Sequence, residues 1–295
     1  MSEHKSLEEQ VIVITGASSG IGLCTALLAA ERGAKLVLAA RSGDILDDIV
    51  EEVSLIGSEA IAVVADVGDR SQVDAIVDAA IDHFGRIDTW VNDAGVAIYG
   101  RLDVVDEEDS RRLFDTNFWG VVNGSLAALP HIRLNNGVLI NIGSEVSDAV
   151  VPLQGMYSAS KHAVKGFTDA LRVEVEEVDK DKVSVVLIQP TAVNTPYPEH
   201  AKNYMDNEPK LPDPMIDPHQ VAEAILQAAE EGGRDIRVGG MAVLNTMLSK
   251  VLPSLADKMA AKQVDRQQRD EVPINPRGNL YDPSHKGQIY GNNVH

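Results

Sequence analysis

The sequence contains a single cysteine, Cys24, among 295 residues. One thiol cannot form an internal disulfide, and such scarcity of cysteine is typical of a reducing compartment. Cys24 stands in the apolar stretch IGLCTALLAA, where we expect a small buried side chain rather than a nucleophile. The eight histidines are scattered and form no H-E-x-x-H pattern, so we expect no catalytic metal.

Long apolar runs and positive charge are also scarce. No uninterrupted apolar stretch reaches the ~18 residues that a membrane-spanning helix needs, and the first ten residues lack the apolar centre of a signal peptide. Lys and Arg number 26 against 45 Asp and Glu, a formal net charge of −19. This charge repels nucleic acid and anionic membrane surfaces. We therefore expect a soluble, cytoplasmic protein that binds no nucleic acid and has no integral membrane segment.

The sequence does contain short apolar β-branched runs that alternate with longer helical patterns. This order is typical of βαβ units and predicts an α/β fold: a single-domain, Rossmann-type, doubly wound structure with a seven-stranded parallel sheet. Because right-handed crossovers bring the carboxyl ends of parallel strands to one edge, we expect ligands at that edge. Strands are predicted at 11–15, 35–40, 60–65, 89–92, 137–143, 183–189 and 235–239. Helices are predicted at about 20–31, 44–56, 70–84, 107–131, 155–178 and 218–231.

Two segments depart from this alternation. Residues 191–217 are rich in Pro and Asn and longer than a usual connection, which indicates a lid or a substrate loop. We assign residues 1–240 to the Rossmann-type domain and 241–295 to a C-terminal extension, a helical segment followed by a coil tail. The helical segment is broken near Pro253. We expect it to pack on the protein's own core or on a second subunit rather than on a membrane surface.

A glycine-rich turn follows the first predicted strand. The motif TGASSGIG places Gly16, Gly20 and Gly22 between this strand and a helix. Such a turn lets the backbone approach a pyrophosphate, which then faces the free amides and the positive dipole end of the helix. The placement therefore predicts a nucleotide site, and the spacing G-x3-G-x-G differs from the common G-x-G-x-x-G.

The end of the second predicted strand, AARS, bears on the choice of cofactor. Ala40 stands where NAD-binding proteins generally carry an acid that binds the ribose 2′-hydroxyl. Arg41 can pair with a 2′-phosphate and stack on the adenine, and Ser42 can add a hydrogen bond. We therefore expect NADP(H) rather than NAD(H). The alternative is that Arg41 is an ordinary surface arginine at the start of a loop.

The segment YSASK places the phenol of Tyr157 four residues before the ammonium of Lys161. Residues at this spacing share one face of a helix, and a nearby ammonium favours phenolate, which brings the tyrosine towards proton transfer near neutral pH. Ser144 ends the fifth predicted strand, at the ligand edge, and Asn117 lies in the preceding long helix. A Tyr–Lys pair by itself would also fit an ordinary surface helix, so the interpretation depends on the whole set.

With TGASSGIG, NDAG at 92–95, Asn117, Ser144 and YSASK in this order, the sequence resembles the short-chain dehydrogenase/reductase family over about residues 8–240. The resemblance implies a nicotinamide cofactor and a homodimer or homotetramer. It implies that Tyr157 is the catalytic acid or base and that Ser144 positions and polarises the substrate carbonyl. It also implies that Lys161 binds the nicotinamide ribose and lowers the Tyr157 pKa, while Asn117 holds a water in a proton relay.

The same resemblance implies the cofactor contacts. Asp66 would contact the adenine, and Asn92 would support the floor of the cofactor site. The candidate cofactor-binding residues are Gly16, Ser18, Ser19, Gly20, Ile21, Gly22, Arg41, Ser42, Asp66, Val67, Asn92, Ala94, Gly95, Tyr157, Lys161, Pro190, Val193 and Thr195.

Two positions depart from the family pattern. Asp93 replaces a usual asparagine, so an acceptor is retained while an amide donor is lost. Thr191 follows Pro190 where glycine is usual, and because a β-branched residue cannot take the unusual backbone angles of glycine cheaply, we expect a differently shaped loop beside the nicotinamide.

The function predicted from these motifs is hydride transfer between NADP(H) and a ketone or secondary alcohol. The expected pocket edges, residues 147–156 and the loop with Tyr197, Tyr204 and Met205, are apolar and aromatic, which favours a moderately hydrophobic carbonyl substrate. One alternative is a non-catalytic NADP-sensing regulator, a class that typically lacks the Tyr or the Lys. Another is a sugar-nucleotide epimerase or dehydratase, which would show G-x2-G-x2-G and a substantial C-terminal substrate domain.

Overall fold

The computed structural model describes residues 4–240, 253–262 and 264–291. Its main sheet has seven parallel strands in the order β3-β2-β1-β4-β6-β7-β9. The predicted doubly wound fold is therefore confirmed, and each predicted strand differs from the observed one by at most one residue at an end. The strands are β1 (Val11–Thr15), β2 (Lys35–Ala40), β3 (Ala60–Val64), β4 (Thr89–Asn92), β6 (Val138–Ile142), β7 (Ser184–Pro190) and β9 (Asp235–Val238).

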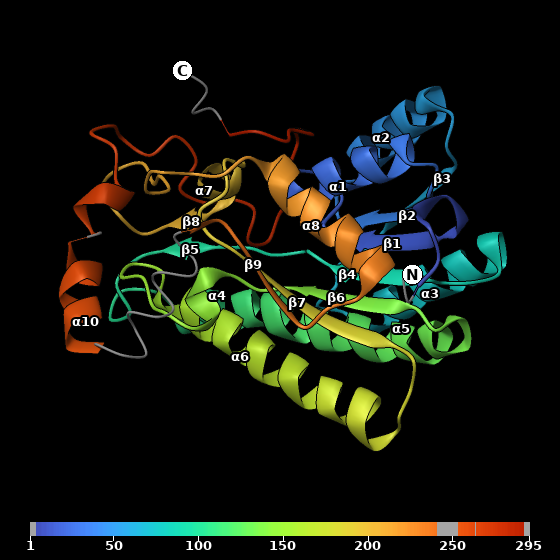
Figure 1. Cartoon of the computed structure of the whole chain (residues 1–295). Helices are drawn as coiled ribbons and strands as arrows, with labels where there is room; N and C mark the ends of the chain where they lie inside the picture. The colour runs from blue at the N-terminus through green and yellow to red at the C-terminus, as the bar shows by residue number, and fades with distance from the viewer. Residues whose placement is uncertain (1–3, 241–252, 263, 292–295) are drawn as a thin grey trace.

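Helices cover both faces of the sheet, as Figure 1 shows. One face packs against α1 (Gly20–Glu31), α2 (Gly43–Ile56) and α8 (Pro218–Glu231). The other packs against α3 (Arg70–Phe84), α5 (Gly120–Asn135) and α6 (Gly155–Arg172). Because both faces are covered, the central strands β1, β4 and β6 are buried along their whole length, which explains the mainly apolar sequences of β1 and β6.

The predicted helix at 107–131 is not a single regular helix. It consists of α4 (Glu107–Phe114), a wider π-helical turn η2 (Asp115–Trp119) and then α5. A second π-helical turn, η4 (Val173–Val178), follows α6, where the prediction extended one helix to residue 178. The extra residue in such a turn redirects the neighbouring side chains. In η2 this places Asn117 in the interior, fully buried.

Several short elements left no pattern in the sequence. The predicted loop at 191–217 contains α7 (Tyr197–His200) and β8 (Lys202–Asn203), which pairs with β5 (Ile98–Tyr99) in a separate two-stranded sheet. Two-residue strands are too short to show the alternation that identifies a strand. The 3-10 turns η1 (Leu7–Glu9), η3 (Glu145–Ser147) and η5 (Asp265–Gln267) complete the described elements.

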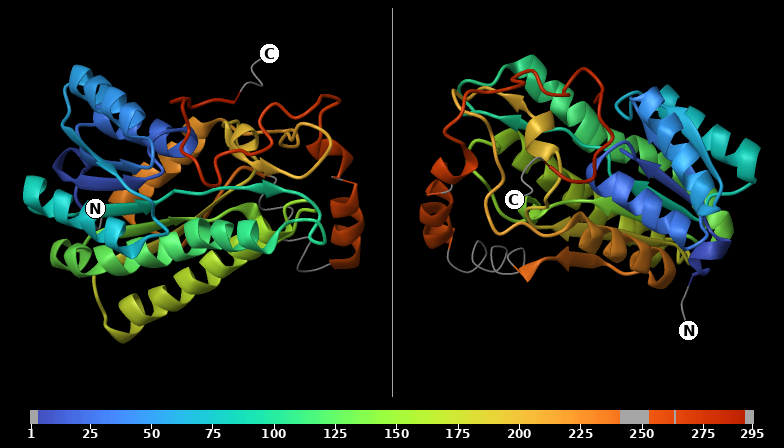
Figure 2. Two further views of the ribbon diagram at one scale, coloured as in Figure 1. Left: turned by 180° about the vertical axis from the view of Figure 1, so that it is seen from behind. Right: turned by 90° about the horizontal axis from the view of Figure 1, so that it is seen from above.

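The C-terminal extension contains α10 (Pro253–Ala261), which begins at the proline where a break was predicted. The remainder of that predicted helical segment, residues 241–252, lies outside the described residues. The coil that follows is packed against the domain, since Leu280 is fully buried. Figure 2 shows it, in red, passing over the edge of the sheet where α1 begins. None of the described helices is both long and apolar enough to cross a membrane.

The far end of α6 is held to the sheet by a buried guanidinium. The Arg172 side chain, 3% exposed, pairs with Asp169 at 2.7 Å and with Asp235 at 3.3 Å. Its Nε also donates to the Val185 carbonyl in β7 at 2.7 Å. This contact is important for the site because α6 carries Tyr157 and Lys161 at its other end.

Replacing Arg172 with alanine should lower the free energy of unfolding by ~3 kcal/mol, because two carboxylates and a buried carbonyl each lose one partner. Chemical denaturation measures this loss. The control is Arg111→Ala, which removes a side chain 75% exposed and paired with Glu107 in α4. This change should cost less than ~1 kcal/mol. Equal effects of the two substitutions would contradict the role assigned to Arg172.

Candidate functional site

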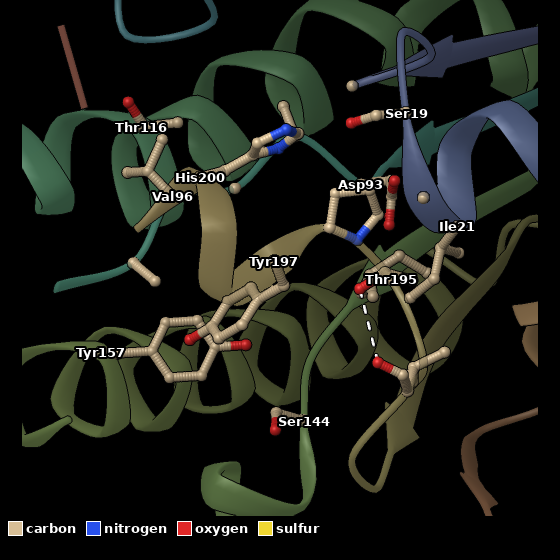
Figure 3. A pocket seen from close by; sticks show the side chains of 18 of the residues that line it. Ser19, Ile21, Asp93, Val96, Thr116, Ser144, Tyr157, Thr195, Tyr197 and His200 are labelled. Carbon is tan, nitrogen blue, oxygen red and sulfur yellow. Dashed lines mark hydrogen bonds between the residues drawn. The ribbon is translucent and has the colours of Figure 1, made fainter. Parts of the chain in front are cut away.

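A cavity of about 260 Å³ runs along the carboxyl ends of β1, β2, β4, β6 and β7 (Figure 3). It brings together nearly all of the sequence-predicted site residues. Three predicted residues do not line it: Gly22, Asn92 and Asn117. The predicted residues that do are Gly16, Ser18, Ser19, Gly20, Ile21, Arg41, Ser42, Asp66, Val67, Ala94, Gly95, Ser144, Tyr157, Lys161, Pro190, Val193 and Thr195.

The glycine-rich turn is shaped as a cradle beside the start of α1. Gly16 has φ +75°, and a Cβ atom there would lie 2.8 Å from the main chain of Ala94. Gly20 has φ +56°, and its Cβ would lie 3.3 Å from the side chain of Thr195 on the opposite wall. Glycine at both positions therefore keeps this part of the cavity open next to the positive end of a helix, a geometry that suits a phosphate-containing ligand.

Tyr157 and Ser144 meet at the other end of the cavity, where Figure 3 shows their side chains. A hydrogen bond between the two hydroxyls lowers the pKa of Tyr157, but burial acts in the opposite direction and raises that pKa to about 12. The phenol is therefore protonated near neutral pH. Burial has the largest effect on this pKa, and the lowering by Lys161 that the family resemblance implies stays a prediction.

Lys161 lies one helical turn after Tyr157, as its spacing predicts. Its Nζ donates to the Ile142 carbonyl at the end of β6, at 2.7 Å, and lies 5.7 Å from the centroid of the Tyr157 ring. Burial lowers the pKa of Lys161 to about 8, while the carboxylate of Asp93 opposes that change. The ammonium is thus charged at neutral pH and held at the floor of the cavity.

Asp93 has a role that the sequence comparison with the family pattern did not suggest. Burial raises the pKa of its carboxyl to about 7, against the charge of Lys161 and a hydrogen bond from the Gly22 amide, both of which lower it. The carboxylate thereby links the first turn of α1 to the ammonium on α6. Asp93 lines the cavity and belongs to the site, although only a lost amide donor was apparent from its residue type.

Asn117 and Asn92 lie behind the cavity wall. Asn117 Nδ2 donates to the Val96 carbonyl at 3.0 Å, and its Oδ1 accepts from the Val96 amide at 2.8 Å. Nδ2 also donates to Ser160 Oγ at 3.2 Å. Asn92 Nδ2 donates to Asn141 Oδ1 at 2.8 Å, which ties β4 to β6. Both asparagines join the strands and helices that surround the site, and the relay role of Asn117 stays a prediction.

The predicted 2′-phosphate contacts have unexpected partners. The guanidinium of Arg41 donates to main-chain carbonyls of residues 279–282, at distances from 2.5 to 3.2 Å. The hydroxyl of Ser42 donates to the Ser284 carbonyl at 2.8 Å. Asp66, the predicted adenine contact, lines the cavity and accepts from Arg112 at 2.5 Å. No pattern in the sequence connects position 41 with a segment more than two hundred residues later.

The substrate end of the cavity has a second tyrosine. The ring of Tyr197 lies 5.4 Å from that of Tyr157, and its hydroxyl donates to Gln154 Oε1 at 2.8 Å. Two other predicted pocket-edge residues, Tyr204 and Met205, do not line the cavity. The Tyr204 hydroxyl instead donates to Asp109 at 2.7 Å. The segment 191–217, predicted as a lid or substrate loop, contributes His200, Leu211 and Pro212 to the cavity, whereas Asn279, Pro283 and Ser284 come from a segment that the sequence did not connect with the site.

The other predictions concern Thr191, Cys24 and metals. Thr191 does not take the left-handed backbone that glycine would favour, and its hydroxyl donates to Glu145 at 3.2 Å. Cys24 is buried, which raises its thiol pKa to about 11, as suits a packing residue. Within the described ranges, no group of three or more His, Cys, Asp or Glu side chains could hold a metal ion.

The model of the short chain dehydrogenase family matches residues 10–205. The chain belongs to the short-chain dehydrogenase family. Among its relatives, the uncharacterized oxidoreductase YxnA of Bacillus subtilis is 47% identical over 283 residues, which cover 94% of this chain and 79% of YxnA. The putative oxidoreductase SadH of Mycobacterium tuberculosis is 34% identical over 267 residues, 88% of this chain and 96% of SadH. The protein is thus an oxidoreductase of this family.

Solved structures of short-chain dehydrogenases have the same fold. A short chain dehydrogenase/reductase from Burkholderia phymatum in complex with NAD has a TM-score of 0.77 at 26% identity, covering 91% of this chain and 99% of its own. An alcohol dehydrogenase from the archaeon Thermococcus sibiricus complexed with 5-hydroxy-NADP has a TM-score of 0.68 at 27% identity. That match covers 78% of this chain and 94% of the archaeal one.

The raised pKa of Asp93 predicts how stability depends on pH. Because the folded pKa of about 7 exceeds the ordinary 3.8, the folded chain binds more protons than the unfolded chain between these values. Stability should therefore fall as pH rises from about 4 towards 7. In Asp93→Asn, the part of this fall due to Asp93 should disappear, as measured by urea unfolding at several pH values below 6.5.

The control for this measurement is Asp103→Asn. Asp103 is exposed, and a hydrogen bond from Arg101 lowers rather than raises its pKa. This variant should keep the same fall in stability over the same pH range. Parallel pH profiles for Asp93→Asn and the unmodified chain would show that the Asp93 carboxyl is ionised well below neutral pH.

Proposed function

We propose that the chain is an NADP(H)-dependent oxidoreductase that transfers a hydride between the nicotinamide and a ketone or secondary alcohol, with Tyr157 as acid or base. The observation that carries this proposal is the meeting of Ser144, Tyr157 and Lys161 at one end of a cavity whose other end is the glycine cradle of α1. The cavity thus joins a proton donor to a phosphate-binding turn, which is the pairing that dinucleotide-dependent hydride transfer requires.

Several observations support a nicotinamide dinucleotide as the cofactor. The Gly16–Gly20 turn leaves room for a pyrophosphate, and the cavity continues from there to Asp66 and Val67 on one side and to Lys161 on the other. Among the described residues, no partner binds the buried hydroxyl of Thr116, which lines the cavity and offers a polar contact. When bound, the cofactor would supply or accept the hydride.

Two arguments favour NADP(H) over NAD(H). The first is the absence of an acidic side chain at the end of β2, where Ala40 stands and lines the cavity. The second is the guanidinium of Arg41, whose positive charge beside the ribose position would attract a 2′-phosphate. The related structures include one complex with NAD and one with 5-hydroxy-NADP, so both cofactors occur in relatives with this fold.

In the reducing direction, charge develops on the carbonyl oxygen as its carbon gains the hydride. The hydroxyl of Ser144 donates a hydrogen bond to this oxygen, and the hydroxyl of Tyr157 donates a hydrogen bond and then its proton. A pKa of about 12 keeps Tyr157 protonated and ready to donate. The ammonium of Lys161, 5.7 Å from the ring centroid, stabilises the phenolate that forms. In the oxidising direction the phenolate accepts the proton.

The walls at this end of the cavity favour an apolar carbonyl compound. Val151, Leu211 and Pro212 line it with Tyr197. The amide of Gln154 is engaged on both sides, because it accepts from Tyr197 and donates to Gln267 at 2.7 Å. It therefore fixes the Tyr197 ring rather than offering a free polar group to a substrate. We propose a moderately hydrophobic ketone as the substrate and a homodimer or homotetramer as the assembly.

Replacing Tyr157 with phenylalanine should reduce ketone turnover by ~10²–10⁴-fold, since the proton donor is lost while the ring is kept. Consumption of NADPH, followed by absorbance with a panel of ketones, measures the rate, and nucleotide binding should change little. Tyr204→Phe is the matched control, because Tyr204 lies outside the cavity, and it should retain turnover. Full activity of Tyr157→Phe would refute the proposed role, and absence of turnover in the unmodified chain would favour an NADP-sensing regulator.

The pH profile of reduction should reflect Lys161. With a pKa of about 8, its ammonium is charged below that pH and neutral above it, so kcat/KM for the ketone should fall as pH rises through about 8. Asp93→Asn removes the carboxylate that raises this pKa, so the fall should move to lower pH. A profile that is identical in the two proteins would contradict the assigned coupling between Asp93 and Lys161.

A further inference from the structure

The last part of the chain forms one wall of the cavity. We define the C-terminal arm as residues 276–291. Three of its residues, Asn279, Pro283 and Ser284, line the cavity together with Asp66 and Val67. Figure 2 shows this arm, in red, crossing the carboxyl edge of the sheet between α1 and α7. The space therefore continues beneath the arm instead of being filled by it.

Contacts with the β2 and α4 side of the cavity hold the arm through its main chain. Four of the five N–H groups of Arg41 are used by the carbonyls of residues 279–282. Arg112 on α4 donates to the Leu280 carbonyl at 3.2 Å, so two guanidinium groups share this acceptor. Because these bonds are charge-assisted, they are among the stronger hydrogen bonds in a protein.

Other contacts reach the opposite side of the cavity. The Asn279 amide donates to the His200 carbonyl, at the end of α7, at 2.7 Å. Farther along, the hydroxyl of Tyr290 lies 3.3 and 3.4 Å from the two carboxylate oxygens of Asp217, the residue that caps α8. The arm therefore bridges both walls. Leu280 adds an apolar anchor, since it is fully buried in a cluster with Val96, Ile98 and Leu113.

The arm also reaches the glycine cradle. The Gly20 amide, the first of α1, donates to the Gln288 carbonyl at 2.8 Å. A Cβ atom at Gly287 would lie 3.0 Å from the side chain of Ile45, so the arm passes close to α2. Ser19 and Ile21, on either side of Gly20, still line the cavity. Because the Gln288 carbonyl occupies the Gly20 amide, a dinucleotide phosphate that binds this amide must first displace this part of the arm.

We propose that the C-terminal arm is a hinged roof over the adenosine half of the cofactor site, so that a bound dinucleotide is released only when the arm lifts. This inference rests on the proposed function, because it takes a nicotinamide dinucleotide as the ligand. It gives Arg41 a second role, that of anchoring the roof, beside any contact with a 2′-phosphate. The roof covers the adenosine that NADH and NADPH have in common, so its loss should speed the release of both nucleotides.

The test measures the rates at which NADH and NADPH leave the full chain, by stopped-flow fluorescence. Gly278→Ala detaches the arm near its start, because Gly278 has φ +57° and a Cβ there would collide with the Ala201 carbonyl. Leu280→Ala removes the buried anchor. Neither Gly278 nor Leu280 lines the cavity. Each variant should release both nucleotides about tenfold faster or more.

The matched control is Gly85→Ala. Gly85 has φ +75°, so alanine imposes the same kind of backbone strain, but a Cβ there meets nothing within 4 Å among the described residues. Its release rates should stay within about twofold of those of the unmodified chain. Arg41→Ala should also speed the release of both nucleotides. The release of NADPH should be accelerated more than that of NADH if Arg41 also binds the 2′-phosphate.

A second measurement needs no substitution. Lys286 is exposed in the middle of the arm, so trypsin cleavage after this residue, followed by mass spectrometry, reports how often the arm lifts. Saturating NADH or NADPH should slow this cleavage several-fold, because a nucleotide beneath the roof holds it closed. Cleavage that is unaffected by nucleotide would overturn the proposal.

The outcomes separate this inference from the proposed function. If both arm variants fold and release NADH and NADPH at unchanged rates, the roof is wrong while the oxidoreductase proposal stands. Slower release from these variants would also overturn the roof, since it would make the arm a competitor of the cofactor. If neither nucleotide binds the unmodified chain, the proposed function fails, and the roof fails with it.

Discussion

The arrangement of the site depends on one buried cation. The ammonium of Lys161 is removed from bulk water, and a buried charge is stable only when neighbouring groups compensate it. The Ile142 carbonyl at the end of β6 and the carboxylate of Asp93 after β4 do so. Asp93 in turn accepts from the Gly22 amide in α1. One charge thereby connects two neighbouring strands, the helix of the glycine cradle and the helix that carries Tyr157.

The same requirement explains how a strongly acidic protein can bind an anionic cofactor. The net charge of −19 would repel phosphate groups at long range. Locally, however, Arg41 and Arg112 gather beside the end of β2, and burial together with their mutual repulsion lowers the pKa of Arg41. Main-chain carbonyls of the arm relieve this repulsion. The positive charge is thus concentrated at one point of the cavity and is stabilised by these carbonyls and by the carboxylate of Asp66.

Much of the fold could be predicted, because its signals are local. A strand covered on both faces is mainly apolar along its length, so β1 and β6 were visible as runs rich in Val, Ile and Leu. The π-helical turn at Asp115–Trp119 was not visible, since one additional residue per turn changes no periodicity that a short window can resolve. The pairing of β5 with β8 was missed because strands of two residues have no pattern.

The sequence by itself identified the candidate site residues that line the cavity: Gly16 and Gly20 of the cradle, Ser144, and the Tyr157–Lys161 pair on one helical face. These depend on spacing along a single element, which the backbone geometry of strands and helices converts directly into position. Only the tertiary structure decided the protonation of Tyr157, the partnership of Asp93 with Lys161 and the packing of the arm on Arg41. Each of these depends on burial and on contacts between distant segments, and neither is encoded at any one position of the chain.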